Sequence, residues 1–126
     1  MKLYYVATPF HMFCALHMIS RENNLKEVDM IVLDHFQSAK ETCSRLVDIG
    51  LINKAVLINK KTKFKHFSYI KRILQSLLLP KSVKDIIDGK QYDEVVFFSN
   101  DFLMAAKLID VFVKTDSCKK YRYGMD

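Results

Sequence analysis

The chain has 126 residues, of which 50% are apolar and 27% are charged, and its formal net charge is +6. This composition excludes a disordered chain, and the length suits one domain with its own hydrophobic core. No apolar run reaches the roughly 18 residues of a membrane span. No small-residue cleavage site follows the opening Met1 and Lys2, so the start does not read as a signal peptide. We therefore expect a cytoplasmic globular protein.

The first apolar run, residues 3–7, is short and rich in aromatic and branched side chains, which indicates a strand buried on both faces of a parallel sheet. Thr8 suits the N-cap of a helix over residues 9–21, and Pro9 suits its first position. Ligands of open α/β sheets bind at such strand-to-helix turns, beside helix N-termini that favour anions. Thr8, Pro9 and His11 are therefore candidate binding residues. The alternative is that Thr8 and Pro9 only shape the turn and that His11 is a partly exposed helix residue.

The helix over residues 9–21 is strongly apolar. Its expected buried stripe consists of Phe10, Phe13, Leu16, Met18 and Ile19, and it is widened by Met12, Cys14 and Ala15. A helix of this composition should be well covered by the rest of the domain.

A second helix has signals at both of its ends. Ser38 is followed three residues later by Glu41, which is the spacing of a capping box. Gly50 suits the C-terminal cap. The sequence therefore predicts a helix between Ser38 and Gly50.

Strands and helices alternate along the whole chain. Further strands are expected at residues 28–33, 55–58, 94–98 and 120–123, with further helical segments at 67–78 and 83–87 and after Ser99. This alternation predicts an α/β fold in which a parallel sheet is covered on both faces. With right-handed crossovers, a doubly wound, five-stranded, Rossmann-like sheet of strand order 3-2-1-4-5 fits best.

The switch point of such a sheet lies between its first and fourth strands, and the turns after these two strands face one crevice. Thr8, Pro9 and His11 would lie on one side of this crevice. Asn100 and Asp101 would lie on the other side, where they also suit a helix cap.

Several familiar sites are disfavoured by the motifs that the sequence lacks. It has neither GxGxxG nor GxxxxGK[ST], and only three glycines, so a backbone cradle for a pyrophosphate is not expected. It has no HExxH motif, and its three cysteines are far apart without zinc spacing. Asp34 could mimic a ribose-binding acid but reads more naturally as a turn residue. We expect neither a metal nor a nicotinamide cofactor.

A basic cluster lies within residues 60–72, which contain no acidic residue. Its members are Lys60, Lys61, Lys63, Lys65, Lys71 and Arg72. Such a cluster attracts phosphates, acidic lipid head groups or acidic glycans. The alternative is a solvated basic loop and helix face.

The opening, KLYYVATPFHMFCALHMI, resembles the start of bacterial sialyltransferases and related capsule or lipooligosaccharide glycosyltransferases, namely glycosyltransferase family 52 and the polysialyltransferase-like group. Members typically open with an apolar strand, a Thr-Pro turn and an apolar helix. The resemblance implies a GT-B arrangement of two facing Rossmann-like domains. Residues 1–126 would form the N-terminal, acceptor-side domain, and the C-terminal domain that binds the CMP-sialic acid donor would lie outside this chain.

The end of the chain fits the same resemblance. The chain stops at Asp126, just after an expected strand, and the carboxyl ends of strands form the functional rim of this fold. We therefore expect a truncated chain or one half of a two-domain enzyme, the alternative being a small free-standing domain with a frayed end. Family members carry two acids and a glycine at the end of an N-terminal strand, and Asp126 matches the first of these three residues. Their later His-Pro motif is absent here.

The resemblance implies inverting, metal-independent transfer of sialic acid from CMP-sialic acid to a surface-glycan acceptor. Asp126 would act as the general base, while His11, Asn100 and Asp101 would bind acceptor hydroxyls. The basic cluster would rest on the inner face of the membrane, where lipid-linked acceptors lie. Without the donor domain, residues 1–126 are expected to be inactive alone, and no cofactor is implied.

Two other classes of function stay open. One is a non-catalytic, flavodoxin-like binding or interaction domain, although a response regulator would need clustered acids where this chain has Thr8 and Pro9. The other is a nucleic-acid-binding domain that uses residues 60–72, although the nearby Phe64, Phe67 and Tyr69 read more naturally as core, so no nucleic acid is expected. The acceptor, its linkage and the oligomeric state are not specified by these motifs.

Overall fold

The computed structural model describes residues 1–22, 27–33, 36–58, 81–87, 89–98, 103–116, 118 and 120–123. The strands are β1 (Lys2–Val6), β2 (Val28–Leu33), β3 (Lys54–Ile58), β4 (Glu94–Phe97) and β5 (Tyr121–Tyr123). The helices are α1 (Pro9–Glu22), α2 (Ala39–Asp48), α4 (Lys81–Ile87) and α5 (Leu103–Thr115). None of the helices in these ranges combines the length and hydropathy needed to cross a membrane.

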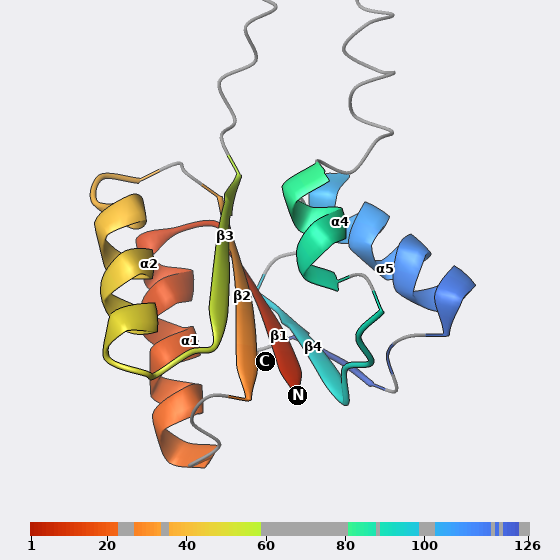
Figure 1. Ribbon diagram of the computed structural model, residues 1–126, viewed down its shortest axis with the longest axis horizontal. Helices are drawn as coiled ribbons and strands as arrows, with labels where there is room; N and C mark the ends of the chain where they lie inside the picture. Colours follow the sequence, from red (N-terminus) through yellow and green to blue (C-terminus); the bar gives the residue numbers. More distant parts are fainter. Residues whose placement is uncertain are drawn as a thin grey trace, which may run out of the picture.

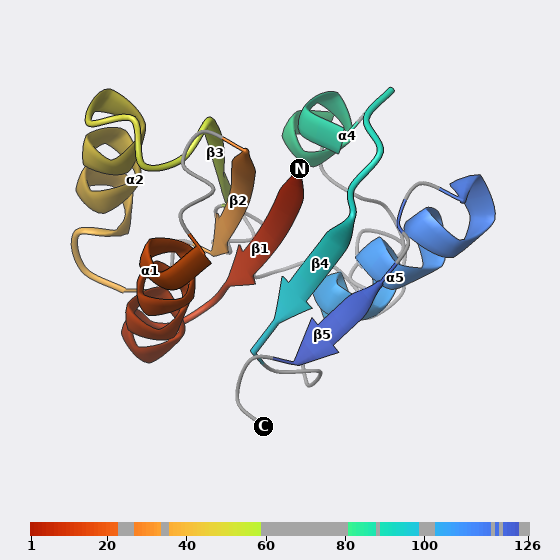
Figure 2. The same ribbon diagram turned by 90° about the horizontal axis from the view of Figure 1, so that it is seen from below.

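The five strands form one parallel sheet in the order β3-β2-β1-β4-β5. Helices α1 and α2 lie on one face of the sheet, and α4 and α5 lie on the other (Figures 1 and 2). The prediction of a doubly wound α/β sheet with its switch point between β1 and β4 is therefore confirmed. Its central strand is the first strand of the chain, so Tyr4 lies beside both Met30 and Val96.

The core consists of two apolar layers, because successive side chains of a strand point to opposite faces. From β1, Leu3 and Tyr5 pack with α4 and α5, whereas Tyr4 and Val6 pack with α1 and α2. All four side chains are at most 1% exposed. This explains why β1 reads as a continuous apolar run in the sequence.

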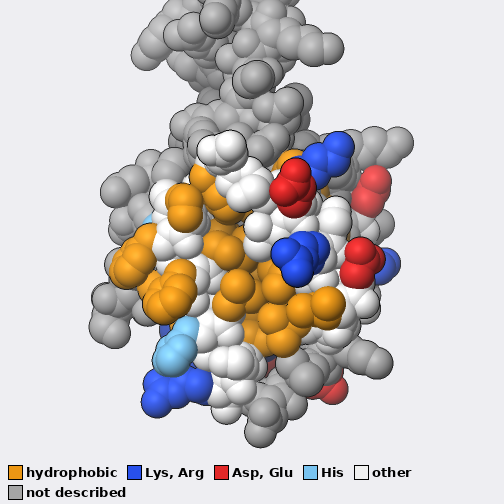
Figure 3. Space-filling model, turned by 90° about the vertical axis from the view of Figure 1, so that its left-hand side faces the viewer, with side chains coloured by type: hydrophobic (Ala, Val, Ile, Leu, Met, Phe, Trp, Pro, Cys, Tyr) orange, Lys and Arg blue, Asp and Glu red, His pale blue; other side chains and the backbone are white. Residues whose placement is uncertain are grey.

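Helix α1 is rotated relative to the stripe expected from its sequence. Phe10 and Phe13 are 56% and 69% exposed, while Met12, Ala15 and Ile19 face the sheet. The prediction that Phe10 and Phe13 are buried in a well covered helix is therefore wrong, whereas the predicted burial of Met12, Ala15 and Ile19 is confirmed. The small Ala15 side chain suits close packing of the helix on the sheet, and one sheet face covers only one side of a helix. Figure 3 shows apolar side chains exposed on this side of the molecule.

The two ends of α2 give opposite outcomes for the capping predictions. Ser38 stands at the N-cap, but it adopts a φ of 65° and its hydroxyl bonds to the Gln37 carbonyl rather than to a helix amide. The predicted capping box is therefore wrong. At the other end, Gly50 has a φ of 77° and donates its N–H to the Val47 carbonyl, and the chain closes as a Schellman motif. The predicted glycine cap is confirmed.

Candidate functional site

The turn after β1 is fixed by Thr8 and Pro9. The Thr8 hydroxyl accepts the N–H of His11 at 3.1 Å, and the Thr8 carbonyl accepts the N–H of Met12 at 3.0 Å. Pro9 occupies the first helical position, where its missing N–H costs nothing. Thr8 is thus the N-cap of α1, as its sequence position predicts, and the turn holds His11 in a defined orientation.

The His11 side chain turns back toward the sheet. Its Nδ1 atom accepts the N–H of Ala7 at 3.3 Å, and its ring stacks on Phe98 at 5.5 Å between centroids. The residue is only 9% exposed, so it is not a solvated helix residue. Since Phe98 directly follows β4, this stack joins the turn after β1 to the end of β4 across the switch point.

The surroundings of His11 favour a neutral imidazole. Burial lowers the pKa of His11 below its ordinary value of 6.5. The hydrogen bond from Ala7 also requires Nδ1 to be unprotonated, which places the ring proton on Nε2. His11 therefore offers a ligand an N–H donor without a positive charge.

Aromatic rings stack on one another at the switch point, next to the turn after β1. Phe98 stacks on Tyr4 of β1 as well as on His11, with the ring centroids of Phe98 and Tyr4 6.5 Å apart. Phe98 itself is 5% exposed, whereas Pro9 and Phe10, which precede His11 in the turn after β1, are exposed. The described part of the crevice is thus packed rather than hollow, and a ligand would meet the exposed rim of the turn.

The other predicted site residues lie outside the described residues. They are Asn100, Asp101 and Asp126, together with the basic cluster Lys60, Lys61, Lys63, Lys65, Lys71 and Arg72. Of the predicted set, Thr8, Pro9 and His11 are described, and they form one continuous turn. Their roles in binding stay predictions.

A buried polar cluster at the amino end of the sheet escaped the sequence analysis. Asp29 of β2 is 0% exposed and accepts hydrogen bonds from Lys90 Nζ at 2.8 Å, Tyr92 at 2.9 Å and Asn53 at 3.0 Å. Burial, followed by the bond to Asp29, raises the pKa of Tyr92. An acid within the otherwise apolar run VDMIVL is a signal for a partnered carboxylate. The partners are distant in sequence, so the pattern could not have identified them.

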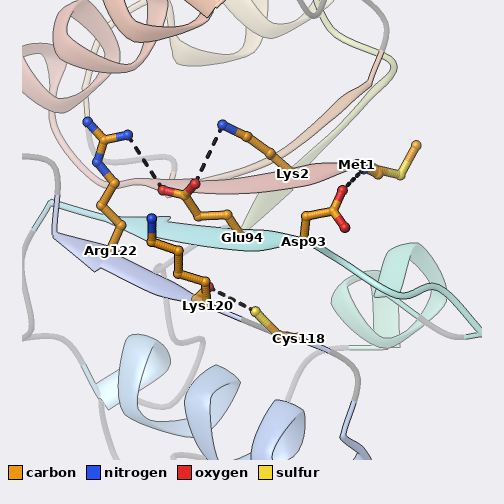
Figure 4. Close-up of polar contacts among 7 residues, drawn as sticks. All are labelled: Met1, Lys2, Asp93, Glu94, Cys118, Lys120 and Arg122. Atoms are coloured by element: carbon orange, nitrogen blue, oxygen red, sulfur yellow. Dashed lines mark hydrogen bonds and ion pairs between the residues drawn. The ribbon is translucent and has the colours of Figure 1, made fainter.

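A second set of charges lies at the same end of the sheet, shown in Figure 4. Glu94 is 6% exposed and pairs with Lys2 at 3.5 Å and with Arg122 at 3.6 Å. The amino group of Met1 pairs with Asp93 at 2.8 Å. Ligands of this fold class bind at the carboxyl ends of the strands, so these contacts are structural rather than part of the candidate site.

Within the described ranges, no three His, Cys, Asp or Glu side chains are arranged to hold a metal ion. Comparison with known proteins gives no relative for this chain: no family model, no curated protein and no solved structure matches it.

Proposed function

We propose that this chain is the acceptor-side, N-terminal domain of a bacterial glycosyltransferase of the sialyltransferase type. The observation that carries the proposal is the His11–Phe98 stack, which brings the Thr-Pro turn after β1 against the end of β4. The carboxyl ends of the strands on either side of the switch point are the usual position of a ligand in this fold class. The resemblance of residues 2–19 to the sialyltransferase opening supplies the substrate class.

The chemistry of the turn suits an uncharged sugar better than a phosphate. The described rim presents the exposed ring of Phe10 and the exposed Pro9, and we assign to the buried, neutral His11 the role of hydrogen-bond donor to the sugar. A sugar presents hydroxyl groups that bind such a donor and C–H faces that pack on apolar surfaces. The Thr8 hydroxyl already occupies one of the free amides of the helix N-terminus, that of His11, which reduces what α1 offers to an anion.

In the proposed reaction, an acceptor hydroxyl attacks the anomeric carbon of sialic acid. The bond from this carbon to the phosphate oxygen breaks, and CMP leaves with the electron pair. Asp126 is proposed to take the hydroxyl proton, which is worth about 10² to 10⁴ in rate. The donor would be bound mainly by the facing domain, and no metal enters the reaction.

NMR titration of the ¹⁵N-labelled chain with N-acetyllactosamine tests the acceptor role. We expect saturable shifts of the amides of residues 7, 8 and 10–12, since Pro9 has no N–H, at sugar concentrations up to about 10 mM, because a millimolar Kd corresponds to only about 4 kcal/mol. The amides of Asn53 and Asp93, at the amino end of the sheet, serve as internal controls. CMP is the matched ligand that should bind weakly or not at all to these residues. If CMP rather than the sugar shifts residues 7–12, or if neither does, the acceptor assignment is wrong.

A transfer assay tests the base in a protein that carries the donor domain after residue 126. Asp126→Asn should lower kcat by about 10² to 10⁴ with little change in the KM for CMP-sialic acid. An unchanged kcat would show that Asp126 is not the general base. The proposed binding of the acceptor by the turn after β1 would then still be tested separately, by the NMR titration.

A further inference from the structure

The outer edge of β3 is open in the described part of the chain. β3 is the last strand on one side of the sheet, and in Figure 1 it stands at the front between α2 and α4. The N–H of Asn53 points to β2, where it bonds to the Val28 carbonyl at 2.7 Å. Within β3 the pairing partner of Lys54 is Asp29, whose backbone faces β1, so Lys54, Val56 and Ile58 direct their N–H groups to β2, and Ala55 and Leu57 direct theirs outward. Such an edge is a template for another strand.

Shallow depressions flank this edge on both faces of the sheet. One, of about 320 Å³, lies between α2 and β3 and is lined by Val47, Ala55 and Leu57 among others. The second, of about 370 Å³, spans the edge and is lined by Val56 and Ile86 of the opposite face as well as by Val47 and Ala55. Side chains of an added strand would point alternately into the two depressions, as in strand addition to a sheet edge.

We propose that the occupant of this edge is a second copy of the chain. Two copies related by a two-fold axis would pair β3 with β3 in antiparallel orientation and place their α2 helices side by side. The result is one continuous sheet through both copies. This proposal is independent of the proposed function, because the β3 edge is separated from the switch point by β2.

The sequence of β3 suits pairing with itself. With the two-fold axis at Val56, Ala55 lies opposite Leu57 of the second copy, and Lys54 lies opposite Ile58 of the second copy. Ala55, Val56 and Leu57 thus face apolar residues, Lys54 faces Ile58 rather than another charge, and no two like charges are directly opposed. The only charged side chain of the strand stands at its end.

The charges of α2 select the same two-fold arrangement. Lys40, Ser44 and Asp48 are exposed, are spaced four residues apart and line the depression between α2 and β3. In an antiparallel pair of α2 helices centred on Ser44, Lys40 of each copy faces Asp48 of the other. Neither side chain forms an ion pair with the residues that the structure describes. This charge complementarity argues for a second copy rather than for an unrelated peptide.

Charge reversal tests the arrangement by sedimentation equilibrium under reducing conditions. The wild-type chain should change from monomer to dimer between about 1 and 200 µM, the range that resolves a micromolar Kd. Each of the substitutions Lys40→Glu and Asp48→Lys places two pairs of like charges opposite each other in the symmetric dimer. Each should therefore raise the Kd by about tenfold or more. The double variant K40E/D48K should return to within about threefold of the wild type.

Two substitutions on the same helix serve as matched controls. Arg45→Glu and Glu41→Lys change the net charge by the same amounts, but neither residue lines the depressions beside β3. They should leave the Kd within about twofold of the wild type. Circular dichroism spectra that match the wild type show that each variant is folded.

Hydrogen exchange at two protein concentrations supplies a readout at single residues. The amides of Ala55 and Leu57 should become protected only at the higher concentration, whereas Val56 and Ile58, which bond to β2, should be protected at both. A chain that stays monomeric to about 200 µM, or a dimer that neither reversal weakens, overturns the proposal. A double variant that fails to restore the dimer likewise overturns the α2 pairing.

Discussion

The two ends of the sheet are held together by different forces. At the amino end, Asp29 is completely buried among three hydrogen-bond donors, and Glu94 bridges Lys2 and Arg122. At the carboxyl end near the switch point, the described contacts are stacked rings, those of Phe98 with His11 and with Tyr4. Charges therefore fix one end, and neutral aromatic packing fixes the other.

This difference matters because the two forces respond differently to change. A substitution that removes the partner of a buried charge strongly destabilises the fold. A substitution in a stack of aromatic rings removes packing contacts and leaves no charge without a partner. The amino end is thus suited to hold the strands in register. At the carboxyl end, the described contacts of Phe98 with His11 and Tyr4 involve no ion pair.

The largest expected effect is at Asp29. Asp29→Ala leaves the Lys90 ammonium, the Tyr92 hydroxyl and the Asn53 amide without their shared acceptor, and should cost about 3 to 5 kcal/mol in the free energy of unfolding. Urea denaturation at neutral pH measures it. Asp110→Ala is the matched control, since its 3.0 Å pair with Lys114 is solvent-exposed and worth about 0.5 kcal/mol or less. Equal losses in the two variants would show that the amino end is not held by this cluster.

An intermediate effect is expected from removing one hydroxyl at each end. Tyr92→Phe deletes a donor that bonds to Asp29 at 2.9 Å, and should destabilise the protein by about 1 to 2 kcal/mol. The Tyr5 hydroxyl is buried and has no hydrogen-bond partner within the described residues, and burial raises its pKa to about 12. Tyr5→Phe should therefore be neutral or stabilising by up to about 1 kcal/mol. Thermal unfolding of both variants measures the two changes in stability. The prediction is wrong if Tyr5→Phe destabilises the protein more than Tyr92→Phe does.

The smallest effect is the acid sensitivity of the carboxyl end. Burial lowers the pKa of His11 in the folded protein below its ordinary value of 6.5. When the pH falls below 6.5, the unfolded chain therefore binds more protons at this residue than the folded protein does. The contribution of neutral His11 to stability is complete above that value and is lost as the pH falls through the folded pKa. When the pH is lowered from about 7.5 to about 5, the free energy of unfolding should therefore decrease less in the His11→Gln variant than in the wild type. Parallel urea curves at both pH values test this, and an equal loss in both proteins would contradict it.

Local signals in the sequence were reliable where neighbouring residues alone decide the structure. β2 spans Val28–Leu33 as expected, because a run buried on both faces is apolar throughout. Thr8, Pro9 and Gly50 act through the backbone of their own turns, so their roles could be predicted as well.

Tertiary contacts decided the features that the sequence did not reveal. The exposure of Phe10 and Phe13 depends on how α1 rotates on the sheet, which its nearly uniform apolar composition does not specify. Ser38 bonds to the neighbouring Gln37 carbonyl instead of capping α2. The His11–Phe98 stack joins residues far apart in the chain, and no local pattern marks such a pair.

The central place of β1 determines when the sheet can close during synthesis. Tyr5 lies beside Ile31 on one side and Phe97 on the other, so one neighbour is made early and the other only late. Pairs of such sequence separation form slowly and leave apolar strands unprotected meanwhile. On the ribosome, β1, β2 and β3 can associate first, while the opposite side of β1 waits for residues 94–97 to leave the exit tunnel. One edge of β1 therefore stays unpaired until late in synthesis, because its partner β4 begins only at Glu94.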